Sequence, residues 1–246
     1  MTKQETITKL LKIEELYHSG KLGEVTHEVY PKLEKNERLN YLYFTLAPAI
    51  NFQRDSKRMW QSAFETFMDP ETTFVFDPLI TKNKSRKDIQ SALVKHRLAL
   101  LTEKHTDIWI KISNKLASEY AGDPANLIEA NRSDVPTIIE YLRVNKTDFP
   151  YLNGPKMSNY WLYILHQFTD VKLKNIQDIS IIPDTHIKKA SVILGLTKSN
   201  TATPEEVELV WKNLLEDTEY MPMQFHAPMW RWSKNKFEPN LEQLTS

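Results

Sequence analysis

The sequence predicts an all-helical protein, and three of its features support this prediction. The chain of 246 residues contains only five glycines, so few residues interrupt a helix. Apolar residues recur at helical spacing along most of the chain. The breaks between these amphipathic stretches fall at groups of turn-forming residues, such as Met68-Asp69-Pro70 and Gly122-Asp123-Pro124.

The helical pattern starts near the N-terminus and continues, with short turns, to residue 236. A hydrophobic content of 41% is enough to bury a substantial core, in one large or two small subdomains. There is no internal repeat and no low-complexity stretch. In chain order, the expected helices cover residues 3–18, 23–34, 37–50, 55–68, 86–98, 104–120, 124–130, 134–143, 156–168, 185–195, 204–217 and 222–236.

The composition excludes several classes of protein. Without cysteine, the chain has no disulfide, zinc–thiolate or iron–sulfur site. No apolar run approaches the ~18 residues of a membrane span, and the N-terminal stretch has the pattern of an amphipathic helix rather than a signal peptide. We therefore expect a cytoplasmic protein. His96 and His105 lack the i, i+4 spacing of helical metal ligands, and the HExxH, Walker and GxSxG motifs are missing, so no metal or cofactor is expected.

Lys156 is expected in the first turn of a helix. Gly154 and Pro155 precede it and together form a turn followed by a helix start. Helically spaced apolar residues follow, among them Trp161 and Leu165. The positive end of the helix dipole favours the neutral, nucleophilic form of an amine at this position.

Asp184 is expected to cap the next helix. It follows Pro183 and precedes a segment in which Ile187, Ala190 and Leu194 lie on one face. An aspartate at such a position accepts hydrogen bonds from the first backbone N–H groups of the helix. A carboxylate held in this way stays ionised.

The segments around these two residues, 149–161 and 179–196, resemble the helix-hairpin-helix DNA glycosylase superfamily. In that superfamily a lysine in the second helix of the hairpin and an aspartate at the start of a later helix face each other across a cleft. The matching positions here are Lys156 and Asp184. The resemblance implies that these two residues are catalytic.

Two further segments extend the resemblance. Residues 39–67 look like the early part of these enzymes, with Asn51, Phe52 and Gln53 in the loop between two helices. The tail at 225–236 is similar to the aromatic C-terminal helix of archaeal 8-oxoguanine glycosylases. The pattern departs from that subfamily in the turn, where Leu152-Asn153-Gly154 lacks the first glycine, and at His226, which stands where an acidic base-reading residue is expected.

The resemblance implies a two-lobed, all-α fold with the active site in the cleft between the lobes. Residues 39–169 would form a helical barrel lobe that contains the hairpin. Residues 1–38 and 170–246 would form the second lobe. The chain is expected to act as a monomer.

The resemblance also implies base excision from double-stranded DNA. Cleavage of an N-glycosidic bond builds positive charge on the sugar, which Asp184 would stabilise, while Lys156 would attack the anomeric carbon and form a Schiff base, adding abasic-site lyase activity. The modified base must first leave the duplex. Trp230, with His226, Phe225 and Trp232, is the candidate base pocket. The candidate DNA contacts are Asn51, Phe52, Gln53, Asn153, Gly154, Lys188 and Lys189.

Two alternatives to housekeeping repair remain open. The chain could remove a hypermodified base from bacteriophage DNA as a defence, since His226 separates it from the 8-oxoguanine subfamily. It could also be a catalytically silent DNA-binding module, which the altered hairpin and the formal net charge of zero favour. The presence of both Lys156 and Asp184 favours an enzyme.

Overall fold

The computed structural model describes residues 1–23, 29–51 and 54–245. These residues form helices and turns, with no strand among them; a single isolated bridge joins Asp134 and Lys174. The prediction of an all-helical protein is therefore confirmed. No helix within the described ranges is both long and apolar enough to cross a membrane.

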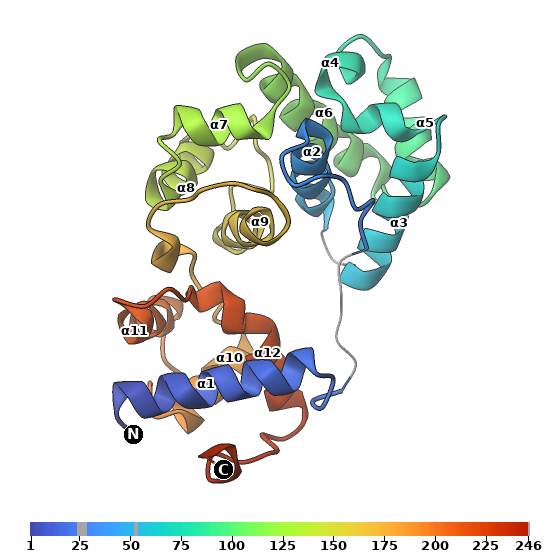
Figure 1. The fold of residues 1–246 in the computed structure, drawn as a ribbon. Helices are drawn as coiled ribbons and strands as arrows, with labels where there is room; N and C mark the ends of the chain where they lie inside the picture. The colour runs from blue at the N-terminus through green and yellow to red at the C-terminus, as the bar shows by residue number, and fades with distance from the viewer. Residues whose placement is uncertain (24–28, 52–53, 246) are drawn as a thin grey trace. The chain divides into compact units, whose positions relative to one another are not determined.

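The chain divides into two compact units. Unit 1 contains the described residues of 1–26 and 175–246. Unit 2 contains those of 27–174. Both ends of the chain therefore lie in unit 1 (Figure 1). The sequence predicts boundaries at 38/39 and 169/170, which differ from these by 12 and 5 residues.

Unit 1 is built around α12. This helix packs against α10 and α1, and the C-terminal segment lies along α1, where the buried Lys9 amine donates a hydrogen bond to the Leu241 carbonyl. The core of unit 1 includes Leu10, Ile13 and Trp211. The elements of unit 1 are α1 (Lys3–His18), η3 (Ile176–Asp178), α10 (Thr185–Ile193), α11 (Pro204–Leu215), η4 (Pro222–Phe225), α12 (His226–Lys234) and η5 (Gln243–Thr245).

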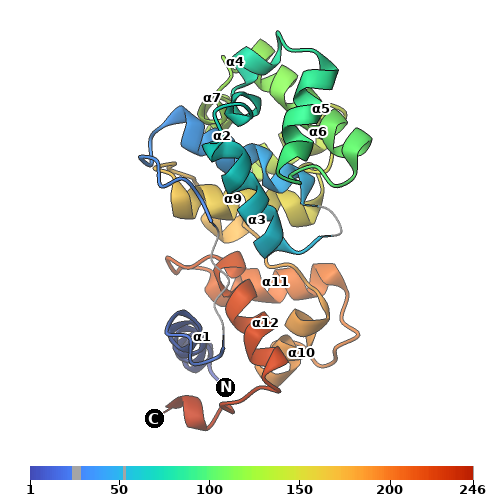
Figure 2. The ribbon, with the colours of Figure 1, turned by 90° about the vertical axis from the view of Figure 1, so that its right-hand side faces the viewer.

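Unit 2 has α2 at its centre. Seven of the nine residues of α2 are buried, and the helix contacts α6, α7 and α9. Figure 2 shows unit 2 from the side on which α3 lies. The buried indole of Trp161 donates to Thr45 Oγ1 at 3.0 Å, which ties α9 to α2. The elements of unit 2 are α2 (Arg38–Leu46), η1 (Pro48–Ile50), α3 (Ser56–Met68), η2 (Thr73–Phe76), α4 (Pro78–Thr81), α5 (Arg86–Lys95), α6 (Thr102–Glu119), α7 (Pro124–Ala130), α8 (Val135–Val144) and α9 (Pro155–Phe168).

Local signals explain most of the helix starts. Proline occupies the first turn of α4, α7, α8, α9 and α11, where its missing N–H costs nothing. Thr2 and Thr203 each form a capping box with a glutamate three residues later. These interactions lie within a few residues of chain, so the sequence reveals them.

The expected helix at 23–34 is wrong over the residues that the structure describes. Residues 29–34 are not helical, and Lys32 has a φ of 52° next to Pro31. In place of a helix, an irregular segment brings the ring of Tyr30 to 5.0 Å from that of Phe168 and 5.4 Å from that of Phe44. Packing against the core of unit 2 therefore overrides the local helical pattern.

Two other regions also differ from expectation. The expected helix at 222–236 is two elements, because the chain passes from the 3-10 helix η4 into α12 at His226. Residues 73–76, between the turn signals at Asp69-Pro70 and Asp77-Pro78, form η2, and residues 78–81 form α4, although no helix was expected in either place. Thr81 holds these short elements together through hydrogen bonds from its hydroxyl to the Phe74 and Asp77 carbonyls.

Candidate functional site

The turn at 145–154 joins α8 to α9 and presents Lys156. The Asn153 side chain donates to the Phe149 carbonyl at 2.7 Å, and the Gly154 amide donates to the Tyr151 carbonyl at 3.2 Å. The left-handed position of the turn is Tyr151, with a φ of 68°, whereas Gly154 is extended and is the N-cap of α9. The turn thus lacks the first glycine of the hairpin pattern, and Tyr151 adopts the left-handed backbone conformation that glycine favours.

Lys156 is exposed in the first turn of α9, as expected from the Gly154-Pro155 signal. It forms neither an ion pair nor a side-chain hydrogen bond with a described residue. Among the residues that the structure describes, no side chain caps the first backbone amides of α9. The Lys156 amine is therefore available to solvent or to a ligand.

The loop that follows η1 is connected to the same turn. The Tyr151 hydroxyl donates to the Asn51 carbonyl at 3.1 Å, and the Asn51 side chain donates to Ser56 Oγ at 2.9 Å. Asn51, Asn153 and Gly154, three of the expected DNA contacts, therefore belong to one connected surface region of unit 2. Phe52 and Gln53 lie outside the described residues.

Asp184 is the N-cap of α10 in unit 1. Its Oδ1 atom accepts from the backbone N–H groups of His186 at 2.8 Å and Ile187 at 3.0 Å. Burial raises the pKa of Asp184, but the contact with His226 and the two amide donors outweigh burial, so the net pKa lies below the usual aspartate value. The carboxylate is thus ionised and its direction is fixed by the helix.

His226, the first residue of α12, faces this carboxylate. Its Nε2 atom lies 3.6 Å from Asp184 Oδ2, which is too long for a hydrogen bond but close enough for an ion pair. That nitrogen is buried and has no hydrogen-bond partner among the described residues. The residue expected to read the base is therefore next to the carboxylate expected to be catalytic.

Trp230 lies one turn further along α12 and is partly exposed. Its ring centroid is 5.3 Å from that of His186, and His186 Nδ1 lies 3.0 Å from Ser233 Oγ. The Lys234 amine is 5.1 Å from the Trp230 ring, and the Arg231 guanidinium is 5.8 Å from it. The result is an aromatic surface with cations beside it.

Phe225 and Trp232 are in the core of unit 1. Both have 0% exposure, and the Trp232 indole donates to the Pro239 carbonyl at 2.8 Å. Neither ring therefore has surface available to a ligand in this structure. Lys188, partly buried, and Lys189, exposed, lie on α10 beyond Asp184, and neither forms an ion pair with a described residue.

Sequence reasoning missed His186 and Ser233. His226, Trp230 and Ser233 are at i, i+4 and i+7, so they lie on one face of α12, and this spacing was a usable signal. The contact of this face with the start of α10 depends on how the helices pack. Residue spacing along the sequence does not reveal it. We call Asp184, His186, His226, Trp230 and Ser233 the α10–α12 cluster.

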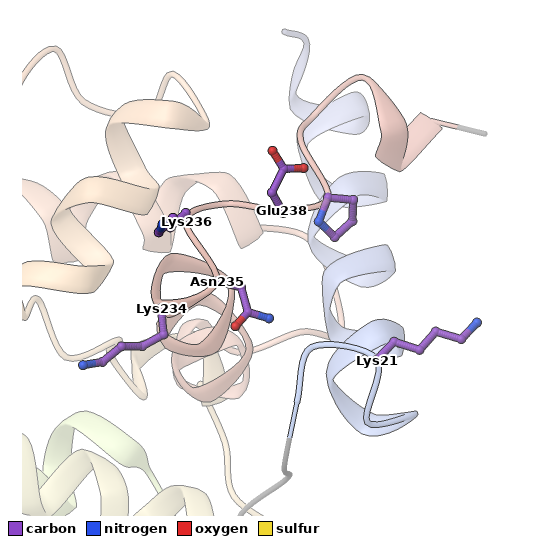
Figure 3. A pocket seen from close by; sticks show the side chains of 6 residues that line it. Lys21, Lys234, Asn235, Lys236 and Glu238 are labelled. Atoms are coloured by element: carbon purple, nitrogen blue, oxygen red, sulfur yellow. The ribbon is translucent and has the colours of Figure 1, made fainter.

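An open hollow of about 530 Å³ lies on unit 1 close to the end of α12. Figure 3 shows Lys21 and Lys234 extending in opposite directions, so these two amines do not converge on a common ligand. The lining residues are Lys21, Lys234, Asn235, Lys236, Glu238 and Pro239. Within the described part of the chain, no group of three or more histidine, aspartate or glutamate side chains could hold a metal ion.

Comparison with protein-family models and with curated protein sequences finds no match to this chain.

Proposed function

We propose that this protein is a DNA glycosylase that removes a modified or damaged base and then cleaves the abasic site through a Schiff base. The observation that carries the proposal is the state of Asp184. Its carboxylate has one oxygen fixed by two backbone amides and a second that accepts no hydrogen bond from a described residue. A fixed negative charge of this kind is what a developing sugar cation requires.

The proposed reaction assigns a step to each of two residues. Lys156 Nζ forms a bond to the anomeric carbon while the N-glycosidic bond breaks, and the base leaves with the bonding electrons and takes a proton from solvent. Opening of the sugar ring gives a Schiff base, from which loss of the C2′ proton expels the 3′ phosphate. Asp184 stabilises the positive charge on the sugar during the first step. Exposure of the Lys156 amine, without an ion-pair partner among the described residues, supports this role.

The proposed base platform is Trp230. A base that leaves the duplex needs an aromatic surface in the enzyme, and cations nearby neutralise the phosphates beside it. Trp230 is the partly exposed aromatic residue of the α10–α12 cluster, and Arg231 and Lys234 flank its ring.

Trp230→Ala should weaken the binding of duplex DNA that carries the modified base by roughly tenfold to a hundredfold, because stacking on an aromatic ring contributes ~1–3 kcal/mol per base. Fluorescence anisotropy with labelled duplexes measures this change. Binding of a duplex with a preformed abasic site should change much less, since no base remains to stack. Equal losses on the two duplexes would mean that the base is read elsewhere.

The proposal is tested by incubating the protein with duplexes that each carry one modified base, and with genomes of bacteriophages whose bases are hypermodified. We expect release of a free base from at least one substrate, detected by mass spectrometry, and no release in Asp184→Asn. Release from phage DNA only would assign the chain to defence rather than repair. Tight duplex binding without base release from any substrate would contradict the proposal and identify a DNA-binding module.

A further inference from the structure

The contact between His226 and Asp184 allows the charge of the histidine to act on the carboxylate. The two side chains come from different helices and meet at 3.6 Å, with exposed fractions of 21% for His226 and 35% for Asp184. Asp184 Oδ1 is occupied by the α10 amides, so the oxygen that faces His226 is the one left for substrate. Any charge on His226 therefore acts directly on that oxygen.

The charged groups of the surrounding elements do not replace this interaction. On α1, Glu14 accepts from the Gln224 side chain and lies 3.9 Å from His18. On α10, His186 is engaged with Ser233. The remaining charged residues of α10 and α12 are Lys188, Lys189, Arg231 and Lys234. Among the described residues, His226 is the sole basic side chain within ion-pair distance of the Asp184 carboxylate.

We propose that His226 is a positioning residue whose protonation state sets the lower pH limit of base excision by Asp184. This inference rests on the proposed glycosylase function and deepens it. When His226 is neutral, the full negative charge of Asp184 faces the substrate. When His226 is protonated, its positive charge pairs with the carboxylate and repels the cation that develops on the sugar.

The sign of the pH dependence follows from these two states. The pKa of Asp184 is held below its usual value, so the carboxylate remains ionised throughout the range in which histidines ordinarily change charge. A loss of activity between pH 8 and pH 5 is therefore not caused by proton uptake at Asp184, and comparison of the wild-type protein with His226→Gln measures the share that belongs to His226. The role assigned to His226 is thus electrostatic control of Asp184, not readout of the base.

The first test does not depend on activity. The ¹³C shift of the Asp184 carboxyl carbon, followed by NMR from pH 8 to pH 5, should show an inflection caused by protonation of His226. In His226→Gln, and equally in His226→Asn, this inflection should disappear, while in His18→Gln, which removes an exposed histidine of α1, it should remain. An inflection that persists in both His226 variants, with folding confirmed by circular dichroism, would overturn the coupling.

The second test is the pH profile of single-turnover excision. In the wild-type protein the rate should fall by up to tenfold per pH unit on the acid side. In His226→Gln the fall from pH 8 to pH 5 should be smaller by about tenfold or more, and any fall common to both proteins belongs to other groups, such as the Lys156 nucleophile. An unchanged acid limb, or a change of base preference without a change of that limb, would refute the proposal. If the wild-type protein releases no base at any pH, the proposed function fails, but the NMR titration still decides whether His226 controls the charge around Asp184.

Discussion

Asp184→Asn should reduce base excision by roughly 10²–10³-fold or more and leave the fold intact. The expected loss follows from the removal of a fixed negative charge beside the developing sugar cation. The fold should survive because the amide oxygen of asparagine can accept the same two bonds from His186 and Ile187, and asparagine caps helices as well as aspartate does. Single-turnover excision and thermal unfolding of the same preparations measure the two effects.

Asp123→Asn is the matched control, because Asp123 also caps a helix, accepting from the Ala125 amide at the start of α7 in unit 2. It should keep nearly full excision activity. If Asp184→Asn retains near-normal excision, the carboxylate has no part in stabilising the transition state. If both variants lose activity equally, the loss comes from destabilised helices rather than from chemistry.

Lys156→Ala should abolish the covalent protein–DNA species that borohydride traps on an abasic duplex. Borohydride reduces the Schiff base to a stable amine link, so the trapped species reports the amine that attacks the sugar. Alanine is a good helix former, and Lys156 is exposed with no side-chain hydrogen bond or ion pair to a described residue, so stability should hardly change. Denaturing gel electrophoresis with labelled DNA detects the crosslink.

Lys146→Ala is the control for charge, since Lys146 is an exposed lysine on the turn that precedes α9. It removes the same positive charge from the same surface region and should still crosslink. A Lys156→Ala protein that crosslinks as well as the wild type would show that another amine is the nucleophile. Loss of crosslinking in both variants would point to weakened DNA binding instead.

Only part of the candidate site could be found from sequence. The positions of Lys156 in the first turn of α9 and of Asp184 as the N-cap of α10 depend on residues within one helical turn, and the structure has both. The partner of Asp184 could not be found in this way. His226 is distant in sequence and had been interpreted as a base reader, whereas its Nε2 atom lies 3.6 Å from the carboxylate.

The aromatic tail shows the same limit. Phe225, Trp230 and Trp232 were expected to share one role because they lie close together in sequence, but two of them are fully buried and Trp230 alone among the three is partly exposed. Which face of an amphipathic helix is covered depends on the elements that pack against it. For α12 these include α1 and α10, which come from the two separate sequence segments of unit 1.

Local sequence signals account for the helical class and most helix boundaries, because periodicity, proline at helix starts and side-chain caps act over a few residues. The environment of each candidate residue depends on tertiary packing instead. Packing leaves residues 29–34 without a helix, with Tyr30 against Phe44 and Phe168, and it places His226 against Asp184. Burial and charge pairing are properties of contacts between distant segments, and a local pattern does not contain them.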